Sequence, residues 1–496
     1  MQKRRSVAFH TLGCKLNFSE TSTLSRLLEN DGFEKKDFTD EADVYVINTC
    51  SVTENADKEC RQLVRRIQRK SPESFVVITG CYAQLKPKEI AEIPGVDLVL
   101  GAAEKFNITQ HLKELHKNDA AKICSCDIED VAGFNSSYSL NDRTRTFLKV
   151  QDGCDYNCSF CTIPLARGKS RSDTIEHVVF NANQLAKNGV KEIVLTGVNL
   201  GDFGKGFNGE KHTENFYQLI QALDEVDGIE RYRISSIEPN LLTNEIIEFV
   251  ANSKKFMPHF HIPLQSGSNK ILGLMRRRYR KELYEEKVSI IKQFMPHCAI
   301  GVDVIVGFPS EDENAFIETY EFLNALDISY LHVFTYSERD NTKALEIKPI
   351  VPMHIRHERN KILRNLSYQK MQQFIAQHSA QIRKVLFEDC NASGLSFHFD
   401  NCMLNHSSFY KTRIRKTLFK ACLLKETDFT GCDLTSAVFN DCDLSDAKFE
   451  NTILEKADLR TAYNYSIDPE KNKLKQAKFS LAGISGLLDK YKIVIE

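Results

Sequence analysis

Between residues 402 and 459 the sequence repeats with a strict period of five. A large apolar residue returns at every fifth position, and a small or modest side chain stands two residues before it. Such a period fits neither the turn of a helix nor the alternation of a flat strand, so the segment requires an architecture of its own. The apolar positions in register are Leu404, Phe409, Ile414, Phe419, Leu424, Phe429, Leu434, Phe439, Leu444, Phe449, Leu454 and Leu459.

This segment resembles the pentapeptide-repeat proteins, which are right-handed quadrilateral β-helices with four pentapeptides in each coil. The resemblance implies that the Leu and Phe ring and the small residues fill the interior. The registered positions would make three coils, and residues 477–484 look like a resumed repeat with a cap. Four cysteines then become interior packing residues rather than ligands, namely Cys402, Cys422, Cys432 and Cys442.

Three cysteines near the middle of the chain, Cys154, Cys158 and Cys161, have the spacing of an iron–sulfur site. Thiolates at this spacing can hold three corners of a 4Fe-4S cube and leave the fourth iron open to an exchangeable ligand. A structural zinc site would need a second ligand pair nearby, and the sequence offers none. Disulfides are disfavoured because we find no secretory leader. The triad therefore predicts a radical enzyme.

Composition sets only broad limits on function. The 496 residues are 42% hydrophobic and 27% charged, which predicts a globular protein of about three domains. The net charge of −1 gives no argument for nucleic-acid binding. Basic runs at 61–70 and 276–280 are typical of solvated helix faces. No apolar run reaches membrane-spanning length, so we expect a cytoplasmic protein without a membrane partner.

Three further cysteines each follow a predicted strand in the N-terminal third: Cys14, Cys50 and Cys81. Strands that alternate with helices form a parallel sheet, whose strand ends meet along one edge. We therefore expect the three cysteines to converge, although each alone would be typical of a buried core residue. Their equivalent positions suggest a second cluster. The predicted strands are 7–12, 44–47 and 75–78, and the predicted helices are 20–29 and 54–69.

From residue 147 onward, six strand and helix pairs indicate a partial barrel. The cysteine triad follows the first strand, and barrel chemistry sits at the carboxyl ends of strands. Polar or glycine-rich strand ends are therefore candidates for holding the amino acid and ribose portions of a cofactor. The predicted strands are 147–150, 192–195, 231–235, 259–264, 300–306 and 330–334. The candidate cofactor-binding residues at strand ends are Gly197, Asn199, Ser236, Glu238 and Gln265, with a further glycine-rich end at 307–311.

Together, these residues resemble the radical S-adenosylmethionine methylthiotransferases, and in particular their MtaB-type branch, which acts on transfer RNA. The resemblance covers about residues 1–388. Besides the two cysteine triads, the motifs that carry it are 11–17 (TLGCKLN), 151–154 (QDGC), 166–172 (ARGKSRS), 234–239 (ISSIEP) and 332–337 (HVFTYS).

The resemblance implies two 4Fe-4S clusters. The cluster on Cys154, Cys158 and Cys161 would bind S-adenosylmethionine and cleave it reductively to a 5′-deoxyadenosyl radical. Phe160 would lie near the adenine. The cluster on Cys14, Cys50 and Cys81 would present sulfur, methylated by a second S-adenosylmethionine.

The implied substrate is N6-threonylcarbamoyladenosine beside the anticodon of transfer RNA, with sulfur replacing the hydrogen at C2. A reducing electron donor and a sulfur source would be partners. The base must be splayed from its loop, and Arg167 and Arg171 are candidates for cationic walls around it. The sequence is silent on oligomeric state.

The chain departs from the family after residue 388. Members continue from a long helix, here 354–382, into a small RNA-binding barrel called TRAM, of which 385–388 resemble only the first strand. A basic stretch at 411–420 is a possible substitute for the RNA-binding surface of the missing TRAM barrel. The predicted domains are 1–120 (doubly wound parallel sheet), 121–142 (linker), 143–350 (partial (β/α)6 TIM-like radical SAM barrel), 351–388 (helical connection with the TRAM remnant) and 389–496 (β-helix with cap).

Two other functions stay open. One is the same chemistry on a ribosomal-protein side chain, and the other is an interaction protein whose repeat binds a partner. The join near residues 387–390 is also compatible with a fusion or a deletion. Cys124 and Cys126 lie in the predicted connection and have no assigned role.

Overall fold

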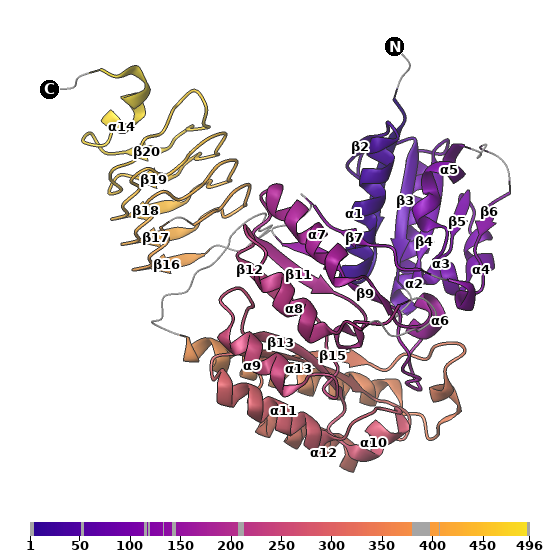
Figure 1. The fold of residues 1–496 in the computed structure, drawn as a ribbon. Helices are drawn as coiled ribbons and strands as arrows, with labels where there is room; N and C mark the ends of the chain where they lie inside the picture. Colours follow the sequence, from indigo (N-terminus) through magenta and orange to yellow (C-terminus); the bar gives the residue numbers. More distant parts are fainter. Residues whose placement is uncertain are drawn as a thin grey trace. The chain divides into compact units, whose positions relative to one another are not determined.

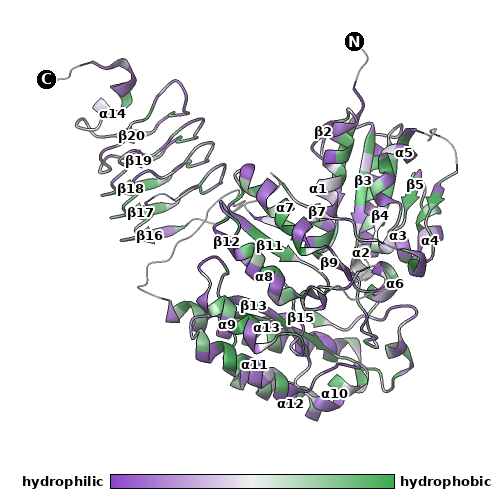
Figure 2. Ribbon diagram, viewed as in Figure 1, coloured by the Kyte–Doolittle hydropathy of each residue, from purple (hydrophilic) through white to green (hydrophobic). Residues whose placement is uncertain are grey.

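The computed structural model describes residues 4–50, 54–113, 117, 120–131, 133–140, 145–206, 213–378, 397–405 and 407–493 (Figure 1). The chain forms two compact units, Met1–Gln377 and His378–Glu496. Hydrophobic residues gather on sheet strands such as β3 (Val44–Thr49) and β11 (Glu192–Thr196), as Figure 2 shows. No helix within these described ranges is both long and apolar enough to span a bilayer.

A six-stranded parallel sheet begins the first unit, with the order β2-β1-β3-β4-β5-β6. Ile47 packs in one apolar cluster with helix α2 (Glu54–Lys70). Its neighbour Val46 packs in another with α1 (Lys15–Asn30), so helices cover both faces of the sheet. The other elements are β1 (Ser6–Thr11), β2 (Glu34–Lys36), β4 (Phe75–Gly80), β5 (Leu98–Leu100), α3 (Cys81–Leu85), α4 (Pro87–Ala91) and α5 (Ile108–Lys113).

The stretch predicted as a linker contributes strands to two sheets. β6 (Lys122–Cys124) is the edge strand of the N-terminal sheet, and β7 (Ser137–Tyr138) pairs antiparallel with β8 (Thr146–Lys149). Cys124 ends β6, with its sulfur 3.7 Å from Nδ1 of His111. Cys124 therefore belongs to a sheet edge.

Six parallel strands follow, in the order in which the sequence predicted them. They form two sheets, β8-β11-β12 and β13-β14-β15, which isolated bridges at Tyr232–Phe256 and Ser236–His261 connect. The strands are β12 (Arg231–Ile234), β13 (His259–Gln265), β14 (Ala299–Val306) and β15 (Tyr330–Thr335), besides β8 and β11. The helices are α6 (Ile163–Arg167), α7 (Ile175–Lys187), α8 (Phe216–Asp224), α9 (Asn244–Asn252), α10 (Asn269–Leu274), α11 (Lys281–Phe294), α12 (Glu313–Ala325) and α13 (Met353–Gln377).

The two faces of these strands differ in chemistry. Alternate residues such as Phe260 and Ile262 on β13 join the main apolar core with the surrounding helices. The residues between them are polar: His261 lies 2.8 Å from Asp303 on β14. Because side chains alternate along a strand, one face of the curved sheet packs on helices and the other carries polar residues such as His261 and Asp303.

In the second unit, strands pair in parallel with the segment one coil later. Phe399 pairs with Phe419 and Phe419 with Phe439, so one coil takes four pentapeptides. Phe419 and Phe439 stack with their ring centroids 4.8 Å apart, and both side chains are fully buried, as the repeat predicts. The strands are β16 (His398–Asp400), β17 (Leu418–Lys420), β18 (Val438–Asn440), β19 (Asp458–Leu459) and β20 (Lys478–Phe479).

The predicted interior cysteines of this unit are buried, although not all to the same degree. Cys422, Cys432 and Cys442 are fully buried, whereas Cys402 in the first described coil is only partly buried. The resumed repeat is also found, because Phe479 of β20 packs against the core before helix α14 (Ser485–Leu488).

The basic stretch at 411–420 is less cationic than its sequence suggests. Arg415 pairs with Asp433 at 2.6 Å, and Lys420 pairs with Asp400 at 3.2 Å. Each acid lies on a neighbouring coil. The residues next to the basic stretch in the sequence therefore do not reveal these ion pairs. Helix α13 ends at Gln377, and the TRAM-like residues 385–388 and Cys390 lie outside the described residues.

Candidate active site

The loop that carries the first cysteine triad follows the short strand β9 (Gln151–Asp152) and depends on a glycine. Gly153 has φ +70°, and a Cβ at this position would lie 2.0 Å from the carbonyl oxygen of Lys169. The next residue, Cys154, donates its backbone N–H to the Gly168 carbonyl at 3.0 Å. The loop is therefore anchored to the end of α6 before its first thiol.

Each thiol of this triad accepts a hydrogen bond from the protein. The backbone N–H of Tyr156 donates to Cys154 Sγ and that of Ile163 to Cys161 Sγ, both at 3.4 Å. The third donor is a side chain, since Arg277 Nη1 lies 3.1 Å from Cys158 Sγ. Hydrogen bonds to sulfur are one way in which proteins stabilise cluster thiolates.

The donor set fits an iron–sulfur cluster. Burial raises the pKa of Cys154 and Cys161 to about 12, so these thiols stay neutral until a metal displaces their protons. Within the described part of the chain, no three His, Cys, Asp or Glu side chains converge closely enough for a single metal ion. A four-iron cube carries its three thiolates on separate irons, and the three thiols of the triad would supply them.

Two predicted cofactor-binding residues connect to this triad through Arg277. Glu238, after β12, forms an ion pair with Arg277, the arginine that also contacts Cys158. The backbone N–H of Glu238 lies 3.4 Å from Asn199 Oδ1, after β11. The structure thus brings both strand ends to the cysteine loop, as the barrel prediction requires.

The other candidates lie on the same rim. Gly197 follows β11, and Ser236 Oγ lies 3.4 Å from His261 Nδ1. Gln265 ends β13 with φ +70° at a break in the strand register. Phe160 packs edge-on against Phe308, with ring centroids 6.3 Å apart. Their contacts to a cofactor stay predictions.

Sequence reasoning missed two organising residues. Gln151 accepts backbone N–H groups from Val198 and Asn199 and donates to the Gly153 carbonyl at 2.8 Å, so it ties β11 to the cysteine loop. Arg277 was grouped with a basic run typical of solvated helices, but its side chain is only 4% exposed. The QDGC motif contained a signal for Gln151, whereas nothing local distinguished Arg277 from its neighbours.

The cysteines of the second triad lie along one edge of the N-terminal sheet, and their joint binding of a cluster stays a prediction. Cys14 precedes α1, Cys50 follows β3, and Cys81 begins α3, at the ends of three adjacent strands. A Cβ on Gly13, which has φ +113°, would lie 3.0 Å from Cys50 Sγ. Asn17 connects the ends of β1 and β3, because its Nδ2 donates hydrogen bonds to the carbonyls of Leu12 and Thr49 at 2.8 and 3.0 Å.

The expectation of a cationic wall fails for Arg167, which does not line the neighbouring cavity, whereas Arg171 does line it. Their exposed fractions are 4% and 9%. Arg167 pairs with Glu20 and Asp152, and Arg171 donates to the Arg167 carbonyl and also pairs with Asp152. Both arginines therefore pair with internal groups, and one of these partners, Glu20, lies 147 positions from Arg167 in the sequence.

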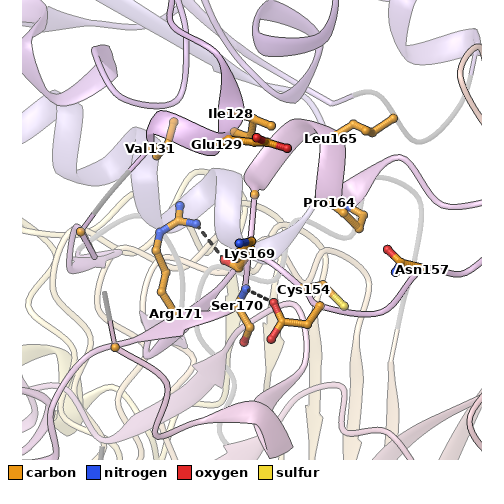
Figure 3. Close-up of a pocket in the computed structure, with 14 residues that line it drawn as sticks. Ile128, Glu129, Val131, Cys154, Asn157, Pro164, Leu165, Lys169, Ser170 and Arg171 are labelled. Carbon is orange, nitrogen blue, oxygen red and sulfur yellow. Dashed lines mark hydrogen bonds between the residues drawn. The ribbon is translucent and has the colours of Figure 1, made fainter. Parts of the chain in front are cut away.

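A cavity of about 500 Å³ borders the cysteine loop (Figure 3). Cys154, Asn157 and Pro164 lie on one part of its wall, and Lys169 and Arg171 on another. The backbone N–H of Ser170 donates to Asp155 at 2.9 Å and closes the wall between them. The loop of the first triad therefore has open space beside it.

Comparison with known proteins first gives the class. Residues 148–323 match the Radical SAM superfamily, residues 6–101 match the uncharacterized protein family UPF0004, and residues 380–459 match the Pentapeptide repeat region. The fold agrees with that of the radical S-adenosylmethionine methyltransferase TsrM from Kitasatospora setae, with a TM-score of 0.52 at 15% identity over 69% of this chain and 77% of that one. The first unit is thus a radical S-adenosylmethionine enzyme fold.

Curated relatives then give the family. The chain is 42% identical to the threonylcarbamoyladenosine tRNA methylthiotransferase MtaB of Aquifex aeolicus over 77% of its length and 93% of the relative, and 41% identical to that of Bacillus subtilis over 77% and 85%. It is 32% identical to the tRNA-2-methylthio-N(6)-dimethylallyladenosine synthase of Clostridium botulinum over 70% and 78%. The chain belongs to the MtaB family of methylthiotransferases.

Proposed function

We propose that this chain transfers a methylthio group to C2 of N6-threonylcarbamoyladenosine beside the anticodon of transfer RNA. The printed activity of its MtaB relatives supports this substrate. The single observation that carries the proposal is the presence of two thiol triads at strand ends within one compact unit. The relatives' names favour transfer RNA over a ribosomal-protein side chain.

Six cysteines would hold the metal cofactors. Cys154, Cys158 and Cys161 would carry one 4Fe-4S cluster, and Cys14, Cys50 and Cys81 a second. When bound, the first supplies the electron that cleaves S-adenosylmethionine, and the second supplies the sulfur.

The other residues of the site bind, orient and exclude water. Arg277 would hold Glu238 and Cys158 in register, which fixes one side of the cofactor site. Gln151 would hold the backbone of Val198 and Asn199 in place against the cysteine loop. The Phe160 and Phe308 pair would exclude water from the adenine side. Polar groups on Gly197, Asn199, Ser236, Glu238 and Gln265 would bind the amino acid and ribose portions of S-adenosylmethionine.

The domain boundaries proposed from the sequence complete this picture. We assign the sulfur-donating domain to 1–120, the partial (β/α)6 radical SAM barrel to 143–350, and a helical connection to 351–388. The repeat at 389–496 is proposed as a right-handed quadrilateral β-helix, which the 20-residue spacing of Lys420 and Asp400 across neighbouring coils supports. A reducing electron donor and a sulfur source are required partners, and we place the enzyme in the cytoplasm with its transfer RNA.

Expression in a strain that lacks its own methylthiotransferase tests the proposal. Mass spectrometry of digested transfer RNA should then find 2-methylthio-N6-threonylcarbamoyladenosine. Cys158→Ala and Cys14→Ala should each abolish it, whereas Cys298→Ala, at a buried cysteine outside both triads, should retain it. Absence of the product despite two bound clusters would refute the proposed substrate.

A further inference from the structure

A buried ionic network lies between the two thiol triads. Glu20 of α1 is fully buried and pairs with Lys105 at 2.7 Å and with Lys149 of β8 at 3.2 Å. Arg167 of α6 pairs with Glu20 at 3.1 Å and with Asp152 at 3.0 Å. The exposed fraction of none of these five side chains exceeds 7%. The network therefore joins the N-terminal sheet to the barrel through charges that water does not screen.

Arg167 reaches the backbone of the second triad through one intermediary. Its Nη2 donates to Asn17 Oδ1 at 2.6 Å. The amide of Asn17 in turn donates to the carbonyls of Leu12 and Thr49. Thr49 directly precedes Cys50, and Leu12 is separated from Cys14 only by Gly13. The guanidinium thus orients the segments that carry two of the three thiols.

The same guanidinium reaches the first triad through Asp152. Asp152 Oδ1 accepts a hydrogen bond from Arg167 Nη1 at 3.0 Å and from the Gly153 backbone N–H at 2.9 Å. Gly153 directly precedes Cys154 and adopts the left-handed conformation that its surroundings demand. Arg167 is therefore one residue removed from the backbone of each cysteine loop.

The network also carries an excess of positive charge. Among the described residues, Lys105, Lys149 and Arg167 pair with the two carboxylates Glu20 and Asp152, and Arg171 adds a further cation beside Asp152. Burying an unbalanced charge is costly, so an anion is expected next to the network. A cluster held by the second triad would be such a neighbour. Helix α6 packs on α3, which begins at Cys81.

We propose that Arg167 is a positioning residue that couples the two triads, holding both cysteine loops in register and balancing the negative charge of a cluster bound by Cys14, Cys50 and Cys81. This inference rests on the proposed function, because it presupposes two clusters. Three thiolates outweigh the charge of an oxidised cube, so the assembled site is anionic and supplies the missing counter-charge.

The test uses the full chain, reconstituted anaerobically with iron and sulfide. In a Cys158→Ala background, the midpoint potential of the second cluster is measured by titration and electron paramagnetic resonance. Arg167→Gln should shift this potential to more negative values, because the reduced cluster loses its neighbouring cation. Arg359→Gln, at an equally buried arginine paired with Glu311 outside the network, should leave the potential unchanged.

Arg167→Lys separates the two parts of the role. A lysine keeps the positive charge, so the midpoint potential of the second cluster should stay near the native value. It cannot donate to Asn17 and Asp152 together, so the magnetic coupling between the two clusters should change in the protein that retains all six cysteines. With transfer RNA, Arg167→Gln should raise the ratio of 5′-deoxyadenosine to methylthio product at least tenfold. If Arg167→Gln does not fold, the coupling in Arg167→Lys decides the question.

The outcomes separate this inference from the proposed function. A native protein that binds only one cluster would overturn both. A native protein with two clusters, together with unchanged potential and coupling in the Arg167 variants, would overturn only the role of Arg167. A negative shift in Arg167→Gln that Arg359→Gln does not reproduce supports it.

Discussion

Arg277 donates a 3.1 Å hydrogen bond to the thiol of Cys158 and at the same time pairs with Glu238. The barrel thereby links a residue of the α10–α11 connection to a cysteine ligand and to a strand end. Both members of this ion pair are largely buried, with exposed fractions of 4% for Arg277 and 13% for Glu238.

Replacing Arg277 should weaken cofactor binding. Arg277→Gln leaves the Glu238 carboxylate buried without its partner, so we expect the dissociation constant for S-adenosylmethionine to rise at least about tenfold, or about 1.4 kcal/mol. Equilibrium dialysis of the reconstituted protein measures this change. The exposed Arg276 is the matched control, and equal effects of Arg276→Gln and Arg277→Gln would contradict the assignment.

Gly153→Ala should prevent assembly of the first cluster. The added Cβ would meet the Lys169 carbonyl at 2.0 Å, so the loop must move and lose the geometry of Cys154. We expect a destabilisation of at least about 2 kcal/mol and loss of about half of the bound iron. Gly189→Ala provides the control, because Gly189 has φ +83° but no atom within 4 Å of the added carbon. Full iron content in Gly153→Ala would show that the loop tolerates the shift.

Removing one aromatic ring from the repeat should destabilise the second unit. Phe429 is fully buried and stacks between Phe409 and Phe449, each with a centroid distance of 5.1 Å. Phe429→Ala should cost about 3–5 kcal/mol and leave the iron content unchanged. Limited proteolysis and thermal unfolding measure the effect. Met403→Ala, at a side chain that is 53% exposed, should change neither, and loss of iron in Phe429→Ala would argue against independent units.

Stability should fall in mild acid because of His259. Burial lowers its pKa from 6.5 to about 3, with nearby Arg233 as the next cause. Below pH 6.5 the unfolded chain takes up a proton that the folded imidazole does not, so stability is lost as the pH falls. This histidine should contribute about 2 kcal/mol of loss between pH 6.5 and 5.

Thermal unfolding across this pH range, compared between the native chain and His259→Gln, measures the contribution. The variant should lose less stability than the native chain between pH 6.5 and 5. His177→Gln, at a side chain that is 50% exposed, is the control. Parallel stability curves for the native chain and His259→Gln would refute the assignment.

Local pattern predicted the elements of this protein well. The strands before Cys14, Cys50 and Cys81 were found because each is a short apolar run that ends at a polar residue. The five-residue period predicted the buried ring of Phe419 and Phe439 because each coil repeats the same local environment.

The charged residues were harder to predict. Arg167 and Glu20 are 147 positions apart, and Arg277 and Cys158 are 119 apart, so no local pattern shows that they meet. From the sequence alone, an arginine side chain is expected to be exposed to solvent unless the acidic group that pairs with it is known. The same limit explains the basic stretch of the repeat, where Asp433 neutralises Arg415 from the next coil.

The sequence by itself determined which thiols stand at strand ends and which residues fill the repeat, because these features depend on neighbours along the chain. Only the tertiary structure decided that Arg167 and Arg277 are internal partners of the cysteine loops instead of surface cations. The physical reason is that a buried charge must find its counter-charge in space, and folding chooses that partner without regard to sequence distance.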